Sequence, residues 1–347
     1  MPGKRELAAS AFCALGLARG VGALRSALLE DLRVLAYHRV LPALDEQRFA
    51  FDIELVSALQ TEFEWQMGYV ARHFQPVSCE QVAQALLQGR PLPRRALMVT
   101  FDDGFRDNYE VAFPVLRRLG VPALFFLSTG YIGGSELYWF DALVHRLLRS
   151  EAAEICVEAL DLRIQLGPTS AQRRAAAAQL LKRLKLVDDA RRRLVLAQVE
   201  KSAGVEISAS DAEPSLPMNW DQVREMAAAG MEFGSHTVSH PILAQLPDAA
   251  QLHAELQASK ACIEREAGRS VSALAYPVGG ASAINAEVLA ATAQAGYRIA
   301  FTYQSGVNRL ATARSAPLQL KRLHVERYTG RAMFEAALQW PELFGAT

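Results

Sequence analysis

The sequence predicts an α/β fold in which helices cover a parallel sheet or barrel. Apolar runs typical of buried strands occupy residues 33–40 and 96–101, and each ends in polar side chains. Two segments with helical spacing, at 63–74 and 79–88, separate these runs. Strands that alternate with helices in this way pack as a parallel sheet or close into a barrel.

The alternation continues to the C-terminus, and no internal repeat is evident. A length of 347 residues suits one large domain with an insertion better than a string of small modules. Apolar periodicity and helix end signals predict the remaining elements. They are helices at 109–119, 220–229, 248–266 and 286–295, and strands at 122–127, 231–234, 272–276, 299–302 and 320–325.

One stretch, residues 141–208, departs from this order. It is rich in alanine, leucine, arginine and lysine, lacks a strand pattern, and predicts about three helices. Its basic residues indicate a solvated helical face, with attraction of an anionic glycan or lipid phosphate as the alternative. We therefore expect an N-terminal amphipathic helical segment, a first barrel part, a helical insertion and a second barrel part, at 1–30, 31–140, 141–210 and 211–347.

Composition excludes several classes of function. Lysine plus arginine and aspartate plus glutamate each number 37, so no net charge favours a nucleic-acid partner. The four cysteines lie far apart, without a CxxC pair. This spacing predicts reduced thiols and argues against a disulfide framework or a cysteine metal site.

The N-terminal segment is apolar at residues 7–17 and follows two basic residues, which is the order of a secretory signal. However, Arg19 and Arg25 interrupt the apolar character, no cleavage site closes it, and no stretch reaches the length of a membrane span. The segment therefore predicts an amphipathic helix that faces the domain or, alternatively, rests on a membrane surface. Its apolar residues are Leu7, Phe12, Leu15, Leu24 and Leu28.

Two neighbouring aspartates, Asp102 and Asp103, follow an apolar strand and precede Gly104. Catalytic groups of α/β barrels collect where strands give way to loops. Neighbouring side chains on a strand point to opposite faces, so both carboxylates enter one site only if the backbone turns here, as Gly104 permits. Simple solvent exposure of the pair is the alternative.

Two histidines lie four residues apart in the segment GSHTVSH, again after a short apolar strand. One helical turn would place His236 and His240 on one face, at a spacing that suits a single metal ion. A carboxylate would complete the ligand set and leave positions open for water and substrate. Capping and packing are the alternative roles for such a pair.

Together these motifs resemble those of the polysaccharide deacetylase family, carbohydrate esterases whose domain is named after the chitooligosaccharide deacetylase of rhizobial nodulation. The matching segments are LAYHRV, VTFDDG, LFFLSTGYIG, GSHTVSH, AYPVGG and LKRLHV, and they span nearly all of the chain outside the insertion. The resemblance implies an irregular (β/α) barrel. It also implies Asp102 as general base, and Asp103, His236 and His240 as ligands of zinc, or of cobalt, nickel or manganese.

The resemblance further implies an oxyanion site in the segment AYPVGG. The expected donor is the backbone N–H of Val278, beside Tyr276, Pro277 and Gly279. A plain strand-to-helix connection is the alternative for this loop.

Four further side chains are candidates for the same site. This chain lacks the arginine that many relatives carry in that loop, so Arg322 is the candidate partner of Asp102, with a structural ion pair as the alternative. The acid that protonates the departing amine is either His38 or His324, and each is otherwise a core histidine. Trp139 is a candidate for stacking on a sugar ring, with core packing as the alternative.

These features predict an amide hydrolase that removes N-acetyl groups from amino sugars of a polysaccharide, oligosaccharide or lipid-linked glycan, as in exopolysaccharide biosynthesis. The alternatives are a deformylase or O-deacetylase of a glycan precursor, and a carbohydrate-binding protein without turnover. A two-carboxylate glycosidase would leave the histidine pair unused. We expect a cytoplasmic protein, at most peripheral to the inner membrane, with an N-acetylated glycan or glycolipid as its partner. The sequence does not specify the sugar, the acyl group or the oligomeric state.

Overall fold

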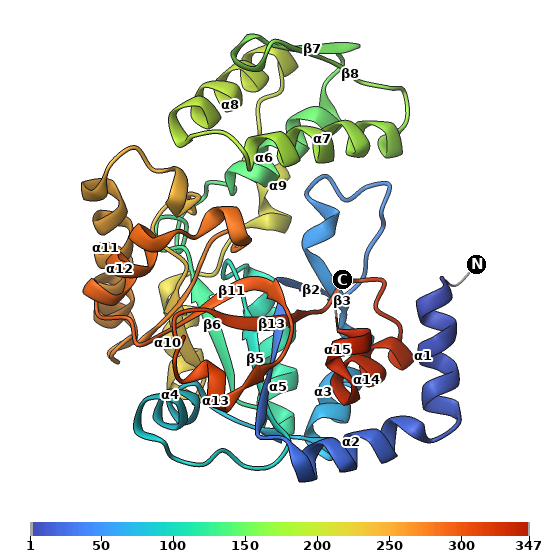
Figure 1. Cartoon of the computed structure of the whole chain (residues 1–347). Helices are drawn as coiled ribbons and strands as arrows, with labels where there is room; N and C mark the ends of the chain where they lie inside the picture. The colour runs from blue at the N-terminus through green and yellow to red at the C-terminus, as the bar shows by residue number, and fades with distance from the viewer. Residues whose placement is uncertain (1–2, 346–347) are drawn as a thin grey trace.

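Seven parallel strands form a closed barrel in the computed structural model, which describes residues 3–345 (Figure 1). The order around the barrel is β1, β13, β11, β10, β9, β6 and β5, and β1 pairs with β5 to close it. The barrel confirms the predicted fold class. Its strands are β1 (Asp31–Tyr37), β5 (Ala96–Phe101), β6 (Ala123–Leu127), β9 (Glu232–Ser235), β10 (Ala273–Ala275), β11 (Ile299–Ser305) and β13 (Leu320–His324).

Alternate residues of each strand face either the barrel interior or the surrounding helices. On β5, Met98 packs with Val34 and Phe126 of neighbouring strands, whereas Val99 belongs to the apolar cluster that includes Phe63 of a covering helix. Strands buried on both faces need apolar residues at every position, which explains the continuous apolar runs in the sequence.

Helices alternate with the barrel strands as the sequence pattern predicts, and smaller strands extend the sheet or pair beside it. The helices outside the insertion are α1 (Lys4–Ala14), α2 (Leu17–Leu28), α3 (Gln60–His73), α4 (Cys79–Gln88), α5 (Phe113–Leu119), α10 (Trp220–Ala228), α11 (Ala249–Ala267), α12 (Ala286–Gln294), α13 (Leu310–Ala313), α14 (Arg331–Gln339) and α15 (Pro341–Phe344). The smaller strands are β2 (Arg39–Leu41), β3 (Val56–Leu59), β4 (Gln75–Pro76) and β12 (Asn308–Arg309).

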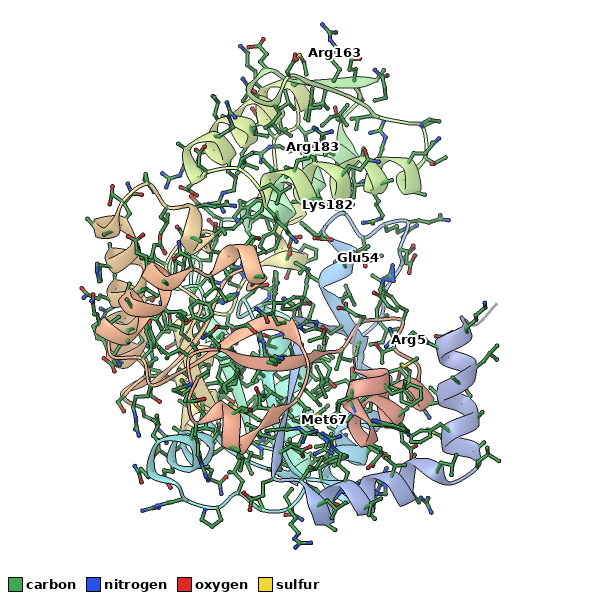
Figure 2. All side chains as sticks on the ribbon, viewed as in Figure 1. Arg5, Glu54, Met67, Arg163, Lys182 and Arg183 are labelled. Carbon is green, nitrogen blue, oxygen red and sulfur yellow. The ribbon has the colours of Figure 1, made fainter. Side chains whose placement is uncertain are left out.

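Between β6 and α10 the chain forms a separate layer of helices, with Arg163 at its outer end and Lys182 nearer the barrel (Figure 2). The prediction that this stretch lacks strands is wrong. Ile155 and Ile164 pair across an antiparallel hairpin, and Ile155 is buried in the apolar cluster of this layer. The elements are α6 (Trp139–Arg149), β7 (Glu154–Val157), β8 (Leu162–Gln165), α7 (Ser170–Leu184), α8 (Asp189–Ala203) and α9 (Ala209–Ala212).

The N-terminal helices α1 and α2 lie against α14 and α15 (Figure 1). The prediction that their apolar residues face the domain holds for Phe12, which is buried, and is wrong for Leu7, Leu15, Leu24 and Leu28, which are exposed. In the described part of the chain, no single helix combines the length and apolar character of a membrane span. The pair α1 and α2 meets those criteria only jointly, across a bend of 81°.

Candidate active site

The carboxyl ends of the barrel strands hold most of the polar residues that the sequence analysis selected. Because the seven strands are parallel, these ends meet at one mouth of the barrel, where barrel enzymes place their catalytic groups. Asp102 follows β5, His236 follows β9, Tyr276 follows β10, and Arg322 lies within β13.

Arg322 and Asp102 form a bidentate ion pair. The terminal nitrogens of Arg322 donate to Asp102 Oδ1 at 2.7 Å and Oδ2 at 2.8 Å, and both side chains are buried. The Arg322 Nε donates to the Thr302 carbonyl at 2.9 Å, which fixes the guanidinium plane. Burial raises the pKa of Asp102, but the charge and hydrogen bonds of Arg322, together with the nearby His236 and His38, outweigh burial and leave this pKa lowered. Asp102 is therefore ionised at neutral pH.

A left-handed turn brings Asp103 into the same barrel mouth. Asp103 has φ 72° and Gly104 has φ 79°. Two successive left-handed residues end the strand alternation, so the neighbouring carboxylates no longer point to opposite faces. The turn that the sequence required at Gly104 thus begins one residue earlier. The Tyr138 hydroxyl donates to the carbonyl of Asp103 within this turn.

The two histidines lie in an irregular loop, so the prediction of a helical turn is wrong. Thr237 and His240 have φ values of 71° and 55°, which no right-handed helix contains. Glu255 accepts the N–H groups of Val238 at 2.7 Å and Ser239 at 3.0 Å, and so replaces helical hydrogen bonds. The two imidazole rings still converge, with centroids 4.8 Å apart.

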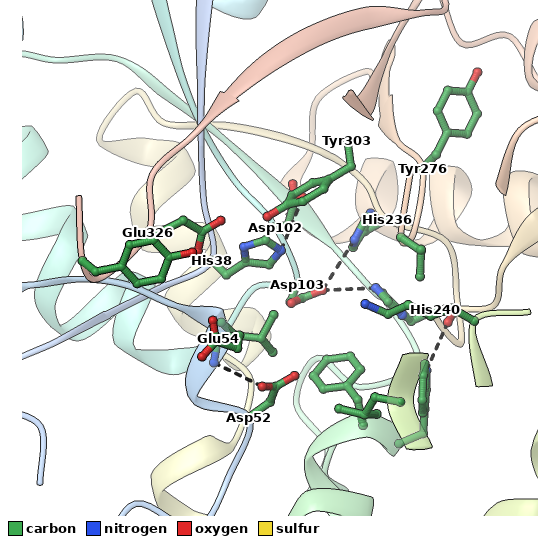
Figure 3. Close-up of a pocket in the computed structure, with 17 residues that line it drawn as sticks. His38, Asp52, Glu54, Asp102, Asp103, His236, His240, Tyr276, Tyr303 and Glu326 are labelled. Atoms are coloured by element: carbon green, nitrogen blue, oxygen red, sulfur yellow. Dashed lines mark hydrogen bonds and ion pairs between the residues drawn. The ribbon is translucent and has the colours of Figure 1, made fainter. Parts of the chain in front are cut away.

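Asp103, His236 and His240 form a buried cluster in which one potential ligand atom from each residue lies within 4.8 Å of the others. Asp103 Oδ1 lies 3.5 Å from His236 Nε2 and 3.4 Å from His240 Nε2 (Figure 3). Within the described residues, this oxygen has no hydrogen-bond partner. His236 Nδ1 lies 2.8 Å from the Ala275 carbonyl, and a proton on Nδ1 leaves the Nε2 lone pair directed at Asp103.

The electrostatics of this cluster favour a cation. Burial lowers the pKa of both His236 and His240, which keeps the imidazoles neutral. Burial, followed by the charges of Asp102 and Asp141, raises the pKa of Asp103 well above its ordinary value. The charges of Arg322 and Arg39 lower this pKa by less than burial and the two carboxylates raise it, so the buried Asp103 carboxylate is only partly compensated. One carboxylate and two imidazoles are a ligand set that suits a divalent ion such as zinc.

Of the two candidate acids, the structure brings only His38 to the pocket above the cluster. His38 Nε2 lies 3.9 Å from Asp102 Oδ2. His324 is not among the residues that line the pocket, because the ring of Tyr303 stacks on it at a centroid separation of 3.6 Å. Burial lowers the pKa of His38 to about 4 and that of His324 to about 3.

The loop after β10 contributes Tyr276 and Val278 to the pocket lining. Pro277 and Gly279 shape its tight turn, in which the Gly279 N–H donates to the Pro277 carbonyl at 2.7 Å. Val278 has φ 63°, a conformation that is rare for a β-branched residue. Strained residues of this kind cluster at functional sites.

The pocket itself has a volume of about 220 Å³ (Figure 3). Trp139 and Phe140 of α6 line it, and Trp139 Nε1 donates to the His240 carbonyl at 3.4 Å. Tyr138, in contrast, is fully buried and stacks on Phe140.

Several pocket residues escaped the sequence analysis. Glu326 is the second residue after β13, close to a strand end as Asp102 is, so its place near a strand end was an available signal. Burial, followed by the charge of Glu54, raises the pKa of Glu326 to about 7. Tyr303 lies in β11, and the others come from the segments after β2 and β13 and from α7 or its C-terminal end, where no local signal marks a pocket residue. The missed residues are Asp52, Glu54, Leu55, Leu181, Lys185, Tyr303, Glu326 and Tyr328.

Fold and site together define a (β/α) barrel with a buried aspartate–histidine cluster at the carboxyl ends of its strands. The family model of polysaccharide deacetylase matches residues 89–197 and 198–300, more than half of the chain. The chain belongs to the polysaccharide deacetylase family, in agreement with the resemblance noted in its sequence.

Two relatives are named poly-beta-1,6-N-acetyl-D-glucosamine N-deacetylase. The protein from Escherichia coli K12 is 37% identical over 92 residues, which are 26% of this chain and 13% of that protein. The protein from Staphylococcus aureus strain MSSA476 is 27% identical over 122 residues, or 33% of this chain and 42% of that protein. The chain thus matches less than half the length of either relative.

Solved structures share the fold. The deacetylase PplD from Streptococcus pyogenes superposes with a TM-score of 0.58 at 19% identity, over 90% of this chain and 98% of that one. IcaB from Ammonifex degensii superposes with a TM-score of 0.57 at 21% identity, over 89% of this chain and 97% of that one. The common architecture therefore includes nearly the whole length of both proteins.

Proposed function

We propose that this chain is a metal-dependent N-deacetylase that hydrolyses acetamide groups on the amino sugars of a glycan. The main support is Asp103 Oδ1, which has no hydrogen-bond partner among residues 3–345, lies beside the Nε2 atoms of His236 and His240, and is next to the ionised Asp102. The names of the two relatives support a polymer of N-acetylglucosamine as the substrate class.

Asp103, His236 and His240 would hold a divalent ion, with zinc favoured by the ligand types. When bound, such an ion lowers the pKa of a water molecule and polarises the acyl oxygen. The Ala275 carbonyl orients His236 by its contact with Nδ1, which is the usual support of a ligating imidazole.

The remaining steps belong to residues of the chain. Asp102, ionised and oriented by Arg322, accepts a proton from the attacking water. The water oxygen adds to the acyl carbon, the carbon–nitrogen bond breaks, and the proton passes to the departing nitrogen. His38 faces the pocket 3.9 Å from Asp102 Oδ2 and is the proposed carrier of that proton. The Val278 N–H is the proposed donor to the acyl oxygen as it gains negative charge.

Metal content and acetate release test this function together. We expect the unmodified chain to bind one divalent ion and to release acetate from β-1,6-linked N-acetylglucosamine oligomers, and Asp103→Asn to lose both properties. Asp161→Asn is a matched control, because Asp161 is also a left-handed aspartate but lies in the β7–β8 hairpin. Failure to bind metal in any preparation would overturn the proposal.

Two other results would assign a different function to the chain. Release of formate, or of acetate only from esters, would assign the same cluster to a deformylase or an O-deacetylase. Binding of metal and glycan without any product would leave a carbohydrate-binding protein.

A further inference from the structure

Helix α2 turns its large apolar side chains outward and its small residues inward. Leu17, Leu24 and Leu28 are spaced so that they share one face, and they are 50%, 62% and 72% exposed. The buried residues of the helix include Ala18 and Gly22. An amphipathic helix packed on a domain normally shows the opposite arrangement, with its large apolar residues inside.

The contacts of α2 with α14, α15 and the start of β1 prevent these three leucines from turning inward. A side-chain carbon added at Gly22 would lie 1.8 Å from Gln339 Oε1, so the side-chain amide of Gln339 on α14 packs directly against this glycine of α2. The buried guanidinium of Arg25 forms ion pairs with Asp31 at 2.6 Å and Glu342 at 2.5 Å. These contacts fix the rotation of α2 about its axis and hold the leucines in solvent.

Helix α1 adds further exposed apolar residues beside basic ones. Leu7 and Leu15 are 57% and 74% exposed. Lys4 and Arg19 are exposed as well, and residues 3–29 contain a single acidic side chain. The outer surface of the two helices thus combines leucines with a net positive charge. We call this surface the leucine face.

We propose that the leucine face of α1 and α2 docks on a membrane surface that contains anionic phospholipid. Leucine side chains would enter the boundary between head groups and acyl chains, while Lys4 and Arg19 would contact lipid phosphates. Because α1 and α2 bend by 81° and Arg25 ties α2 to the body, the pair lies along the surface and does not cross it. This proposal does not depend on the activity of the barrel.

Charge argues against a second copy of the chain as the occupant. A symmetric dimer places the same patch of both copies face to face. Lys4 and Arg19 of one copy would then approach the same cations of the other, and within residues 3–29 only Glu6 of each copy is available to offset their repulsion. An anionic lipid surface supplies acidic partners.

Vesicle flotation with the full chain tests the proposal. We expect binding to vesicles of phosphatidylcholine with about 30% phosphatidylglycerol, and weaker binding to pure phosphatidylcholine. The double variant Leu24→Gln/Leu28→Gln should lower the partition coefficient at least about tenfold, because both side chains lose their apolar contact with lipid. Lys4→Gln/Arg19→Gln should lower it roughly tenfold on anionic vesicles only.

The control is Leu186→Gln/Leu194→Gln, which changes two leucines of similar exposure, 71% and 52%, near α7 and in α8. Its binding should equal that of the unmodified chain. All changed residues are exposed, so an unaltered thermal unfolding midpoint is the expected sign of intact folding. The proposal is overturned if the unmodified chain binds neither kind of vesicle. It is also overturned if the Leu24→Gln/Leu28→Gln variant binds vesicles as strongly as the unmodified chain. An unmodified dimer that this variant converts to a monomer, without vesicle binding, would assign the leucine face to a second copy.

Discussion

The floor and the rim of the pocket are built in different ways. The floor, which comprises Asp102, Asp103, His236 and His240, comes from the segments directly after strands β5 and β9 and is buried throughout, and the buried Arg322 of β13 supports it. The rim, which comprises Glu54, Lys185, Glu326 and Tyr328, comes from loops and from the end of α7, and most of it is exposed. The difference indicates that tightly packed segments at the strand ends hold the groups proposed to react, while surface segments line the approach to them.

The largest expected difference between floor and rim is in the rate of the chemical step. Asp102→Asn should lower acetate release about a thousandfold, because the amide cannot accept the proton from water. The variant should still bind one metal ion, since Asp103 and both histidines remain. Steady-state kinetics with metal analysis of the same sample measures both. Substantial activity in this variant would show that Asp102 is not the base.

The ion pair beneath the site predicts a large change in stability. Arg322→Met should lower the free energy of unfolding by about 3–5 kcal/mol, because it leaves the Asp102 carboxylate buried without its partner. The double variant Arg322→Met/Asp102→Asn should recover much of this loss, since no unpaired charge remains. Denaturant unfolding at neutral pH measures the free energies of unfolding of the unmodified chain and of these variants. Equal stability of Arg322→Met and the unmodified chain would contradict the burial of the pair.

The rim predicts a smaller effect that depends on pH. Burial raises the pKa of Glu326 from 4.5 to about 7, so between these values the folded chain binds more protons than the unfolded chain. Stability should therefore fall as pH rises through this window. Glu326→Gln should reduce the fall by on the order of 2 kcal/mol between pH 5 and 8. Denaturant unfolding at both pH values tests this, and an unchanged slope would contradict it.

The smallest effect is expected where the rim is most exposed. Lys185→Ala should raise KM a few-fold with kcat unchanged, because an exposed side chain that lines the pocket contributes on the order of 1 kcal/mol to substrate binding. Lys182→Ala is the matched control on α7, since Lys182 does not line the pocket. A large loss of kcat in Lys185→Ala would mean that the rim takes part in the chemistry.

Sequence patterns predicted the barrel because its strands are apolar at nearly every position. The patterns gave wrong predictions where apolar residues belong to short strands or lie exposed to solvent. The β7–β8 hairpin was missed because its strands are short and lie in a helix-rich stretch, although Ile155 and Ile164 pair across it. The exposure of Leu24 and Leu28 was missed because α2 contacts the body through its small residues instead.

The sequence by itself determined the alternation of strands and helices, the pair Asp102–Asp103 after a strand, and the membership of a family, because these features depend on residues close together in the chain. Tertiary structure decided which distant groups meet. Arg322 reaches Asp102 across 220 positions of the sequence. The ring of Tyr303 separates His324 from the pocket, and no pattern near His324 in the sequence indicates this. Lys185 enters the rim because α7 ends above the barrel mouth. Such contacts arise from the packing of separate segments, which the pattern of any one segment does not contain.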